Sequence, residues 1–576
     1  MDTAKKFPNY KNLVEVIRDR QEERDRGITF VEDDEKEQII SYHRLYEEAL
    51  TRLYHLQDKG LKPGDELVFQ IDNNCDFIIT FWACLLGHII PVPVTTAAND
   101  RYILKLFSIW KSLNKPYLIT FKKHLDKLNQ FAGEANTGNT FSQIKANAIF
   151  LDDIEGSGKH GRIYYPMETD IAFIQFSSGS TSQSKGVVLT HKNLMTNLKA
   201  IIKGLQPPAA GDRTLSWMPL THDMGLIGFH LTPIVANWFQ FIMPTPLFIR
   251  NPSLWLRKVC EHKATLTSSP NFGYKHVLRF FNPGKMAGLD LSSVRLIFNG
   301  AEPISAELCN KFLDEMAPFG LQRKAMFPVY GLAEASLAVS FSEPDEEMAA
   351  AVVDRDSLHI GQKVKEVDMG NGLSLVEVGT PVDNCSLKIV AASKEEVGDR
   401  VVGHILIKGE NVTSGYYNNL EATKETITPD GWLDTGDLGF LRDGRLVITG
   451  RVKETIFANG HTYFSHDIES AAEEVEGFQV NRAAAVGVYN PQLQCDEIIC
   501  FVLFKKNDIT DFLPLAMALK KWVVKKVGVG VSYVIPVKHI PTTTSGKIQR
   551  YRLKEAFLDG EFDPLLREIG ALQNMN

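Results

Sequence analysis

The feature of this sequence that most limits its fold is a loop of small hydroxyl residues and glycines set between two apolar runs. The first run, Ile171–Phe176, predicts a buried strand, and the loop that follows, Ser177–Gly186, holds one cation, Lys185. Val187–Leu189 then predicts a second short strand. The next residue, Thr190, is a suitable N-cap for a helix that follows it.

The composition of this loop suits the oxygens of a polyphosphate. Hydroxyls and backbone N–H groups are accessible where no bulky side chain intervenes, and Lys185 adds positive charge. The order Ser184-Lys185-Gly186, running into a strand, differs from a Walker P-loop, in which Gly-Lys-Ser/Thr opens a helix. The alternative is a flexible Ser/Gly linker, which does not explain an ending of Lys-Gly-Val-Val-Leu between two apolar runs.

The composition is that of a globular protein with more than one structural unit. The chain has 576 residues, of which 44% are apolar and 23% are charged. Its net charge of −7 argues against a nucleic-acid partner. The seven cysteines are scattered, without a Cys-x-x-Cys pair, which argues against a disulfide framework or structural zinc. With no secretory signal at the start, we expect a reducing, cytoplasmic location.

One segment, residues 77–94, is long and uncharged enough to resemble a short membrane span. Gly87, Pro91 and Pro93 interrupt it. We therefore predict a buried helix over residues 76–86, followed by a strand over residues 89–94, and no transmembrane segment.

Strand and helix patterns alternate through the first half of the chain. Strands are predicted at Leu67–Phe69, Tyr117–Thr120 and Ala148–Leu151, with helices between them. That alternation is typical of a parallel sheet covered by helices. Residues 343–400 predict a β-rich subdomain, and a smaller α/β unit begins near Arg451.

Polar turns follow several predicted strands. The apolar run Val294–Phe298 leads to Asn-Gly-Ala-Glu-Pro at 299–303, and Pro-Val-Tyr-Gly-Leu-Ala-Glu follows at 328–334. Ligands of open α/β sheets bind beyond the carboxyl ends of such strands, so these turns predict one shared crevice.

Individual side chains in these turns have both a functional and an ordinary interpretation. Tyr330 could stack on a base, Glu334 could hold Mg²⁺ against phosphate oxygens, and Asp437 could hold a ribose diol. Glu334 alone is also compatible with an acid in the first turn of a helix, His222-Asp223 with a capping pair, and Lys547 with a solvated surface lysine.

Six motifs occur in a fixed order, and together they identify a family resemblance. They are the 177–185 loop, Asn-Gly-Ala-Glu-Pro (299–303), Tyr-Gly-Leu-Ala-Glu (330–334), Thr-Gly-Asp (435–437), Gly-Arg-Val-Lys (450–453) and Ser-Gly-Lys (545–547). Over residues 30–555 the chain resembles the adenylate-forming superfamily of acyl-CoA synthetases, peptide-synthetase adenylation domains and luciferases.

The resemblance implies an α/β fold with two domains. We expect a large N-terminal domain of helix-covered sheets plus the β-rich subdomain over residues 1–450, holding the ATP and acyl sites. A small, mobile α+β C-terminal lid domain would span residues 451–576. The implied reaction joins a carboxylate to ATP, giving an acyl-adenylate and pyrophosphate, and then transfers the acyl group to a thiol.

The resemblance also implies roles for residues that match the motifs. Lys547, Glu334 and Lys185 would be catalytic, with Glu334 binding Mg²⁺ and Lys453 at the hinge. The ATP-binding residues would be Ser177, Ser178, Gly179, Ser180, Thr181, Gly300, Ala301, Glu302, Tyr330, Gly331, Asp437 and Arg451. Preplaced cations are what adenylation needs most, because the attacking carboxylate brings negative charge to an anionic phosphorus.

Within the superfamily the chain is most similar to fatty acyl-AMP ligases, which pass the acyl group to an acyl carrier protein. The similar segments are His-Asp-Met-Gly-Leu-Ile-Gly (222–228), Ser-Pro-Asn-Phe (269–272), Tyr-Gly-Leu-Ala-Glu-Ala-Ser-Leu (330–337) and the longer 343–380 region. Glu454 and the run 461–466 depart from the usual pattern. The acyl pocket is predicted at His222, Ile227, Asn271 and Phe272.

The substrate and partner expectations follow from this subfamily. We expect a medium- or long-chain fatty or hydroxy acid, because apolar residues follow Asp223, although Asp223 itself could pair with an amino-acid ammonium. The lysines of 512–526 could dock the holo carrier protein or form a solvated face. The alternatives are an acyl-CoA synthetase, a peptide-synthetase-type adenylation domain and a catalytically silent nucleotide-binding regulator.

Overall fold

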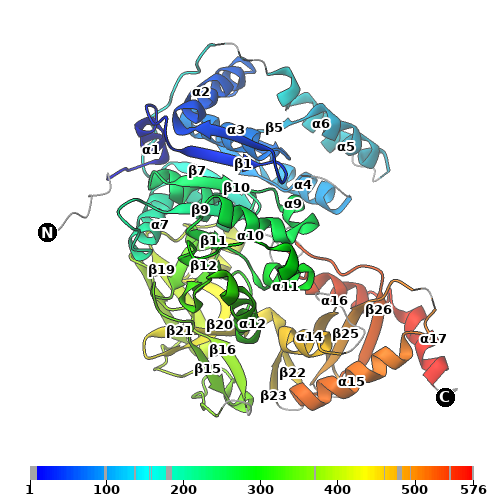
Figure 1. The fold of residues 1–576 in the computed structure, drawn as a ribbon. Helices are drawn as coiled ribbons and strands as arrows, with labels where there is room; N and C mark the ends of the chain where they lie inside the picture. The colour runs from blue at the N-terminus through cyan, green and yellow to red at the C-terminus, as the bar shows by residue number, and fades with distance from the viewer. Residues whose placement is uncertain are drawn as a thin grey trace.

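A long mixed sheet runs through the first part of the chain (Figure 1). The computed structural model describes residues 9–96, 100–134, 138–154, 156, 158–176, 184–368, 372–458, 461–475, 483–492, 495–506, 508–543 and 546–573. In spatial order the strands are β17 (Thr380–Pro381), β14 (Ala338–Phe341), β13 (Met326–Gly331), β12 (Leu296–Asn299), β11 (Leu266–Ser268), β9 (Arg213–Ser216), β10 (Phe239–Ile242), β1 (Gly27–Val31) and β2 (Glu37–Ser41).

The middle of this sheet is parallel and its edges are antiparallel. Strands β1, β10, β9, β11, β12 and β13 run in one direction, whereas β2 on one side and β14 on the other reverse it. The outermost strand β17 is antiparallel to β14 and so again runs with the middle strands. The carboxyl ends of β9, β11, β12 and β13 therefore meet at one edge of the sheet, which sets the position of the site described below.

A second sheet is fully parallel, as the alternation of strand and helix patterns predicts. Its strands, in spatial order, are β4 (Ile90–Pro93), β3 (Glu66–Gln70), β5 (Pro116–Thr120) and β6 (Ala148–Phe150). Beside it lies the antiparallel hairpin of β7 (Ile171–Phe176) and β8 (Gly186–Thr190), which confirms the two strands expected around the Ser/Gly loop. Residues 177–183 of that loop lie outside the described part of the chain.

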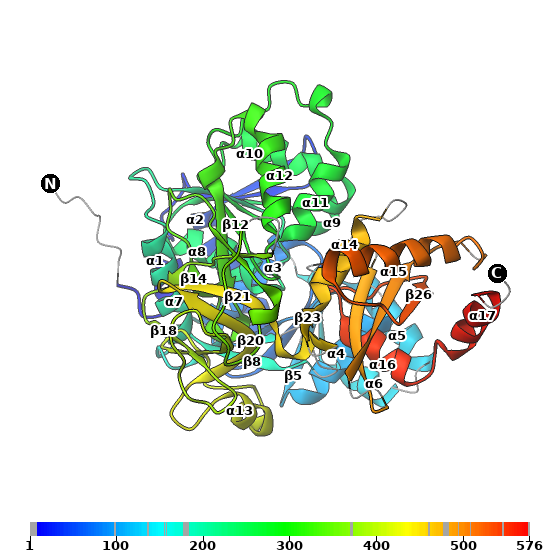
Figure 2. The same ribbon diagram turned by 90° about the horizontal axis from the view of Figure 1, so that it is seen from below.

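Helices cover both sheets (Figure 1, Figure 2). They are α1 (Leu13–Asp19), α2 (Tyr42–Asp58), α3 (Asn74–Gly87), α4 (Asp100–Ser112), α5 (Lys122–Glu134), α6 (Gly138–Ala146), α7 (His191–Gly204), α8 (Thr232–Val235), α9 (Thr245–Arg250), α10 (Pro252–Glu261), α11 (Asn271–Phe280) and α12 (Ala306–Met316). The expected cap of α7 is present: the Thr190 side chain accepts from the Asn193 N–H, and Asn193 in turn accepts from the Thr190 N–H.

The uncharged segment before residue 94 is a buried helix and strand. Helix α3 is enclosed along nearly its whole length, and β4 follows it after His88, which ends the helix in the left-handed conformation (φ 52°). Among the described helices, none combines the length and the apolar character needed to cross a membrane.

The β-rich region consists of two antiparallel units and one helix. The hairpin is β15 (Ala350–Val353) and β16 (Leu373–Val376), the sheet is β18 (Cys385–Val390), β19 (Gly403–Gly409), β20 (Leu433–Arg442) and β21 (Arg445–Arg451), and the helix is α13 (Leu420–Thr426).

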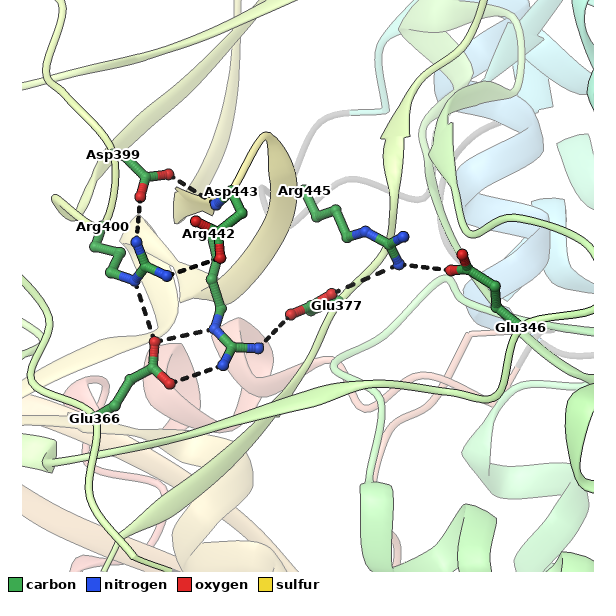
Figure 3. A network of polar contacts seen from close by, with 8 residues as sticks. All are labelled: Glu346, Glu366, Glu377, Asp399, Arg400, Arg442, Asp443 and Arg445. Atoms are coloured by element: carbon green, nitrogen blue, oxygen red, sulfur yellow. Dashed lines mark hydrogen bonds and ion pairs between the residues drawn. The ribbon is translucent and has the colours of Figure 1, made fainter.

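An ion-pair network fixes the turn between β20 and β21 (Figure 3). Arg442 donates two bonds to Glu366, at 3.0 and 2.8 Å, and one to the buried Glu377 at 2.7 Å. Arg400 adds bonds to Glu366 and to Asp443 in the turn. These charge-assisted bonds hold the end of the hairpin opposite to Asp437 and Arg451.

In the described part of the chain beyond β21, the strands form a two-stranded and a three-stranded sheet with their own apolar clusters. The strands are the hairpin β22 (Thr455–Ala458) and β23 (His461–Phe464), with β24 (Ala483–Asn490), β25 (Cys495–Leu503) and β26 (Tyr533–Val537). The helices are α14 (Ser465–Glu473), α15 (Leu513–Val527), α16 (Arg550–Leu558) and α17 (Asp563–Gln573). Separate apolar clusters line the two faces of the three-stranded sheet. The division into domains after residue 450 stays a prediction.

Two buried histidines make the stability of the fold depend on pH. The Trp82 Nε1–H donates to His230 Nε2 at 2.8 Å, so His230 donates its other ring hydrogen to Gln240 Oε1, 2.9 Å away. Burial lowers the pKa of His230 to about 4, and burial also lowers the pKa of His191 to about 4. Both side chains are therefore held neutral in the folded chain.

We predict that the free energy of unfolding falls as the pH drops from about 6.5 to 4. In this range the two histidines are protonated in the unfolded chain but stay neutral in the folded one. Each histidine contributes a slope of about 1.4 kcal/mol per pH unit in this window, and none above it. His230→Gln keeps both hydrogen bonds, so it should lower the slope by one such contribution. Urea denaturation at several pH values measures it, and an unchanged slope in the variant would contradict the assignment.

Candidate active site

One cavity of about 1080 Å³ brings together residues from most of the sequence motifs. Typical small-molecule sites occupy roughly 300–1,000 Å³, so this one can hold a nucleotide and a second ligand. The expected site residues on its wall are Lys185, His222, Asn271, Phe272, Ala301, Glu302, Tyr330, Gly331, Glu334, Asp437, Arg451, Lys453 and Lys547.

Two of the expected residues that the structure describes, Ile227 and Gly300, are not on that wall. Ser177, Ser178, Gly179, Ser180 and Thr181 lie outside the described residues. Ile227, predicted in the acyl pocket, is fully enclosed in the apolar core. A side chain at Gly300 would stand 2.7 Å from the Val329 carbonyl oxygen, so this glycine permits the close approach of β13 to the turn after β12.

The wall of the cavity is built from the segments that follow parallel strands. Residues 221–224 follow β9, residues 271–275 follow β11, residues 301–307 follow β12, and residues 330–334 close β13. Because these strands are parallel neighbours, their carboxyl ends deliver the four segments to one place.

A buried carboxylate organises one end of the cavity. Asp437 is 5% exposed, and it accepts the Tyr330 hydroxyl hydrogen at 2.6 Å and the Arg451 Nε–H at 2.7 Å. Burial, with the charge of Asp437, raises the pKa of Tyr330 well above its usual value, so the hydroxyl stays a donor. The carboxylate also raises the pKa of Arg451, which faces it across the β20–β21 pair.

Tyr416, which the motifs did not single out, joins two expected residues. Its hydroxyl donates to Glu334 Oε1 at 2.9 Å, and the Lys185 ammonium lies 4.7 Å from the centre of its ring. Burial, followed by the charge of Glu334, raises the pKa of Tyr416. The chain near Tyr416 is fixed to β8, because the Tyr417 N–H donates to the Gly186 carbonyl at 2.7 Å. Only the spatial neighbourhood reveals this residue.

The donor set at Glu334 fits Mg²⁺, which is usually held by one or two carboxylates together with substrate phosphates. In the part of the chain that the structure describes, the one cluster of three metal-ligating side chains is elsewhere: Glu37, Glu261 and His262. The Lys258 ammonium lies 2.8 Å from Glu37 and 2.9 Å from Glu261, so this cluster is an ion-pair group.

Lys547 enters the cavity from a tight turn near the end of the chain. The Thr543 N–H donates to the Lys547 carbonyl at 2.7 Å, and the Lys547 N–H donates to the Thr543 hydroxyl at 3.0 Å. Burial lowers the pKa of Lys547, while the negative charges of Asp223, Glu302 and Asp437 oppose that effect. Acids from three segments of the wall therefore favour the charged form of this lysine, whereas burial and the charge of Arg451 disfavour it.

Arg550 ties this turn to the rest of the C-terminal region. Its guanidinium donates two bonds to Glu469, both at 2.7 Å, and a third to Glu454 at 2.9 Å. Although burial acts in the opposite sense, these acids raise the pKa of Arg550 overall. Glu454 directly follows Lys453, so Arg550 connects the expected hinge to the segment that carries Lys547.

The His222-Asp223 pair lies where the cavity turns toward the apolar core. Nδ1 of His222 is 2.6 Å from Asp223 Oδ1, which also accepts the Met224 N–H at 2.7 Å. Burial acts to raise the pKa of Asp223, but His222, Lys547 and the Met224 N–H together lower it. The pair thus both begins a helix and faces the cavity.

An apolar arm of the cavity passes a π-helix, Met224–Leu231, where the sequence predicted only a helix start. Wide turns of this kind are rare and are frequent at functional sites. The apolar side chains that line the arm include Ile201, Leu205, Met224, Phe229, Trp238, Phe298, Leu337 and Phe341. Gly228 lies on this wall, and a side-chain carbon there would be 3.1 Å from Leu337 and from Met224.

Comparison with known proteins agrees with this geometry. The family model described as "AMP-binding enzyme" matches residues 18–417. The chain therefore belongs to the family of AMP-binding enzymes, which are adenylate-forming ligases that use ATP. Its mixed α/β fold is that of this family, as the resemblance implied.

Three of the similar proteins carry the names of acyl-activating enzymes. A protein of Caulobacter vibrioides (strain NA1000 / CB15N), provisionally named an acyl-CoA synthetase, is 30% identical over 91% of either chain. The long-chain-fatty-acid–AMP ligase FadD32 of Mycolicibacterium smegmatis is 31% identical over 87% of this chain and 86% of its own. A solved structure from work on fatty acyl-adenylate ligases of E. coli and L. pneumophila superposes with a TM-score of 0.85. It is 30% identical and covers 96% of this chain and 99% of its own.

We predict that Tyr330→Phe weakens ATP binding about fivefold, because the Asp437 carboxylate loses a donor worth about 1 kcal/mol. Calorimetric titration with a non-hydrolysable ATP analogue measures the affinity. Tyr274→Phe is the matched control, since the Tyr274 hydroxyl is buried and has no hydrogen-bond partner among the described residues. Equal affinities for the two variants would show that the Tyr330 hydroxyl does not position Asp437.

Proposed function

We propose that this protein activates a medium- or long-chain fatty acid, or a hydroxy acid of similar length, as its acyl-adenylate and passes the acyl group to the phosphopantetheine thiol of an acyl carrier protein. The observation that carries the proposal is the continuity of the cavity. The same cavity is lined by Asp437, Glu334 and Lys547 and also by apolar side chains of the π-helix and of the core. Each methylene buried in such an arm contributes about 0.8 kcal/mol to binding.

The residues at the polar end would assist adenylation. The acid's carboxylate oxygen attacks the α-phosphorus of ATP, the bond to the β-phosphate oxygen breaks, and pyrophosphate leaves. Lys547 would hold the developing negative charge, while Asp437 with Arg451 would orient the ribose. Lys185, beside Tyr416, would receive the leaving phosphates. Mg²⁺ bound at Glu334 would supply further neutralising charge.

An amino acid is the less favourable substrate at this site. Asp223 could hold an ammonium, but one of its oxygens already contacts His222 and the Met224 N–H. The wall beyond it is apolar, as the tail of a fatty acid requires. CoA as the acceptor is the second candidate, and the provisional name of the Caulobacter relative favours it.

Exchange of labelled pyrophosphate into ATP, with a panel of fatty, hydroxy and amino acids, tests the first half of the proposal. Exchange should require one of the long acids. Addition of CoA, or of a holo carrier protein, then identifies the acceptor by the product that forms. Failure of every carboxylic acid to support exchange would refute the proposal.

We predict that Lys547→Ala lowers the exchange rate about 10²- to 10³-fold, the usual effect of losing one preplaced electrostatic group. ATP affinity and the melting temperature should change little, because the lysine acts on charge that develops during the reaction. Lys538→Ala, a surface lysine of the same region, is the control and should exchange normally. A Lys547→Ala enzyme with normal exchange would exclude this role.

We predict that Gly228→Leu lowers kcat/KM for hexadecanoate at least about tenfold and leaves butanoate nearly unaffected, since the new side chain would meet Leu337 and Met224 across the arm. Exchange assays with the two acids measure the ratio. Gly570→Leu is the control, because a side chain there meets nothing within 4 Å. An equal loss for both acids would mean that the tail binds elsewhere.

A further inference from the structure

Helix α11 contacts the turn that carries Lys547. Gly546, which precedes the lysine, packs against the Phe272 ring: a side-chain carbon at Gly546 would lie 3.1 Å from it. The ring is itself held in place, stacked on His276 with 5.5 Å between centroids and edge-on to Trp217. The sequence predicted Phe272 only as part of the acyl pocket.

One turn further along, the same helix forms an ion pair with the C-terminal region. The Lys275 ammonium donates to Glu473 Oε2 on α14 at 2.7 Å, and the two side chains are 23% and 14% exposed. Both views of the ribbon place α11 beside α14 (Figure 1, Figure 2). A pair this enclosed is screened less than a surface pair, so it can contribute to orientation.

The start of α11 is also fixed to the nucleotide side of the cavity. The Asn271 side chain donates to the Pro303 carbonyl at 2.7 Å and accepts the Ser305 N–H at 3.3 Å. The Phe272 N–H donates to Glu302 at 3.3 Å. One short helix therefore contacts both the turn after β12 and the segment that inserts Lys547.

We propose that α11 is the docking surface that seats the C-terminal region with Lys547 in the cavity, and that Lys275 and Glu473 are its positioning pair. The contact with Phe272 fixes how far the turn that carries Lys547 enters the cavity. The Lys275–Glu473 ion pair fixes the orientation of the C-terminal region about that contact. The activity readout for this inference rests on the proposed function.

Reversal of the charges tests the pair. Lys275→Glu and Glu473→Lys should each lower the pyrophosphate exchange rate roughly tenfold, within the range of coupling between contacting residues, with the KM for ATP nearly unchanged. The double variant Lys275→Glu/Glu473→Lys should recover to within about threefold of the unmodified enzyme. Transfer of the acyl group from purified acyl-adenylate to the thiol acceptor breaks the carbon–oxygen bond of the acyl group and forms no bond to the α-phosphorus, so it should not slow in the single variants.

A double variant no better than the single ones would overturn the proposal. Lys311→Glu, an exposed lysine on the neighbouring helix α12, is the matched charge control and should exchange normally. Lys275→Gln provides a second measurement if a charge reversal lowers the melting temperature. It should reduce exchange less than Lys275→Glu does, since it removes attraction without adding repulsion.

A cross-link tests the contact without any assay of activity. A carbodiimide joins an ammonium and a carboxylate only when they touch, forming an amide with net loss of water. Mass spectrometry should find the Lys275–Glu473 link in the unmodified protein and not in Glu473→Gln. Its absence from the unmodified protein would overturn the docking proposal. Lack of exchange with every acid would instead count against the proposed function, and the cross-link would still decide the docking.

Discussion

The arrangement of the site depends on acids that favour the charged form of an ammonium group held away from bulk water. Burial lowers the pKa of Lys547, and the charges of Asp223, Glu302 and Asp437 oppose that effect only in part. These acids come from the ends of β9 and β12 and from β20. The charge environment of Lys547 therefore depends on three separate parts of the wall, which makes the local electrostatics a product of the whole sheet.

The acids in turn require their own partners. Asp437 has Tyr330 and Arg451, and Asp223 has His222. Removing an ion from water costs several kcal/mol unless such partners are supplied. The charged groups on the cavity wall are therefore held by one another. The apolar side chains beyond the π-helix need no such partners.

Local chemistry in the sequence was enough to predict much of this. Apolar runs of three to six residues predicted the strands, Thr190 predicted a helix cap, and polar turns after strands predicted much of the cavity wall. The enclosed position of Ile227 was not predictable, because the π-helix changes which face of Met224–Leu231 meets the cavity. Tyr416 and Arg550 act through partners far away in the chain, and single-residue patterns carry no information about such pairs.

The β20–β21 pair has a consequence for how the two halves of the chain communicate. Asp437 and Arg451 face each other in this pair, and Arg451 is the last residue of β21 before the chain continues into the C-terminal region. A ligand that contacts this pair therefore acts at the point where the C-terminal region begins. If binding of a ligand at this pair changes the equilibrium between two positions of the C-terminal region, then by thermodynamic reciprocity the affinity for the ligand differs between those positions by the same factor. Ligand occupancy and the position of the C-terminal region are therefore coupled.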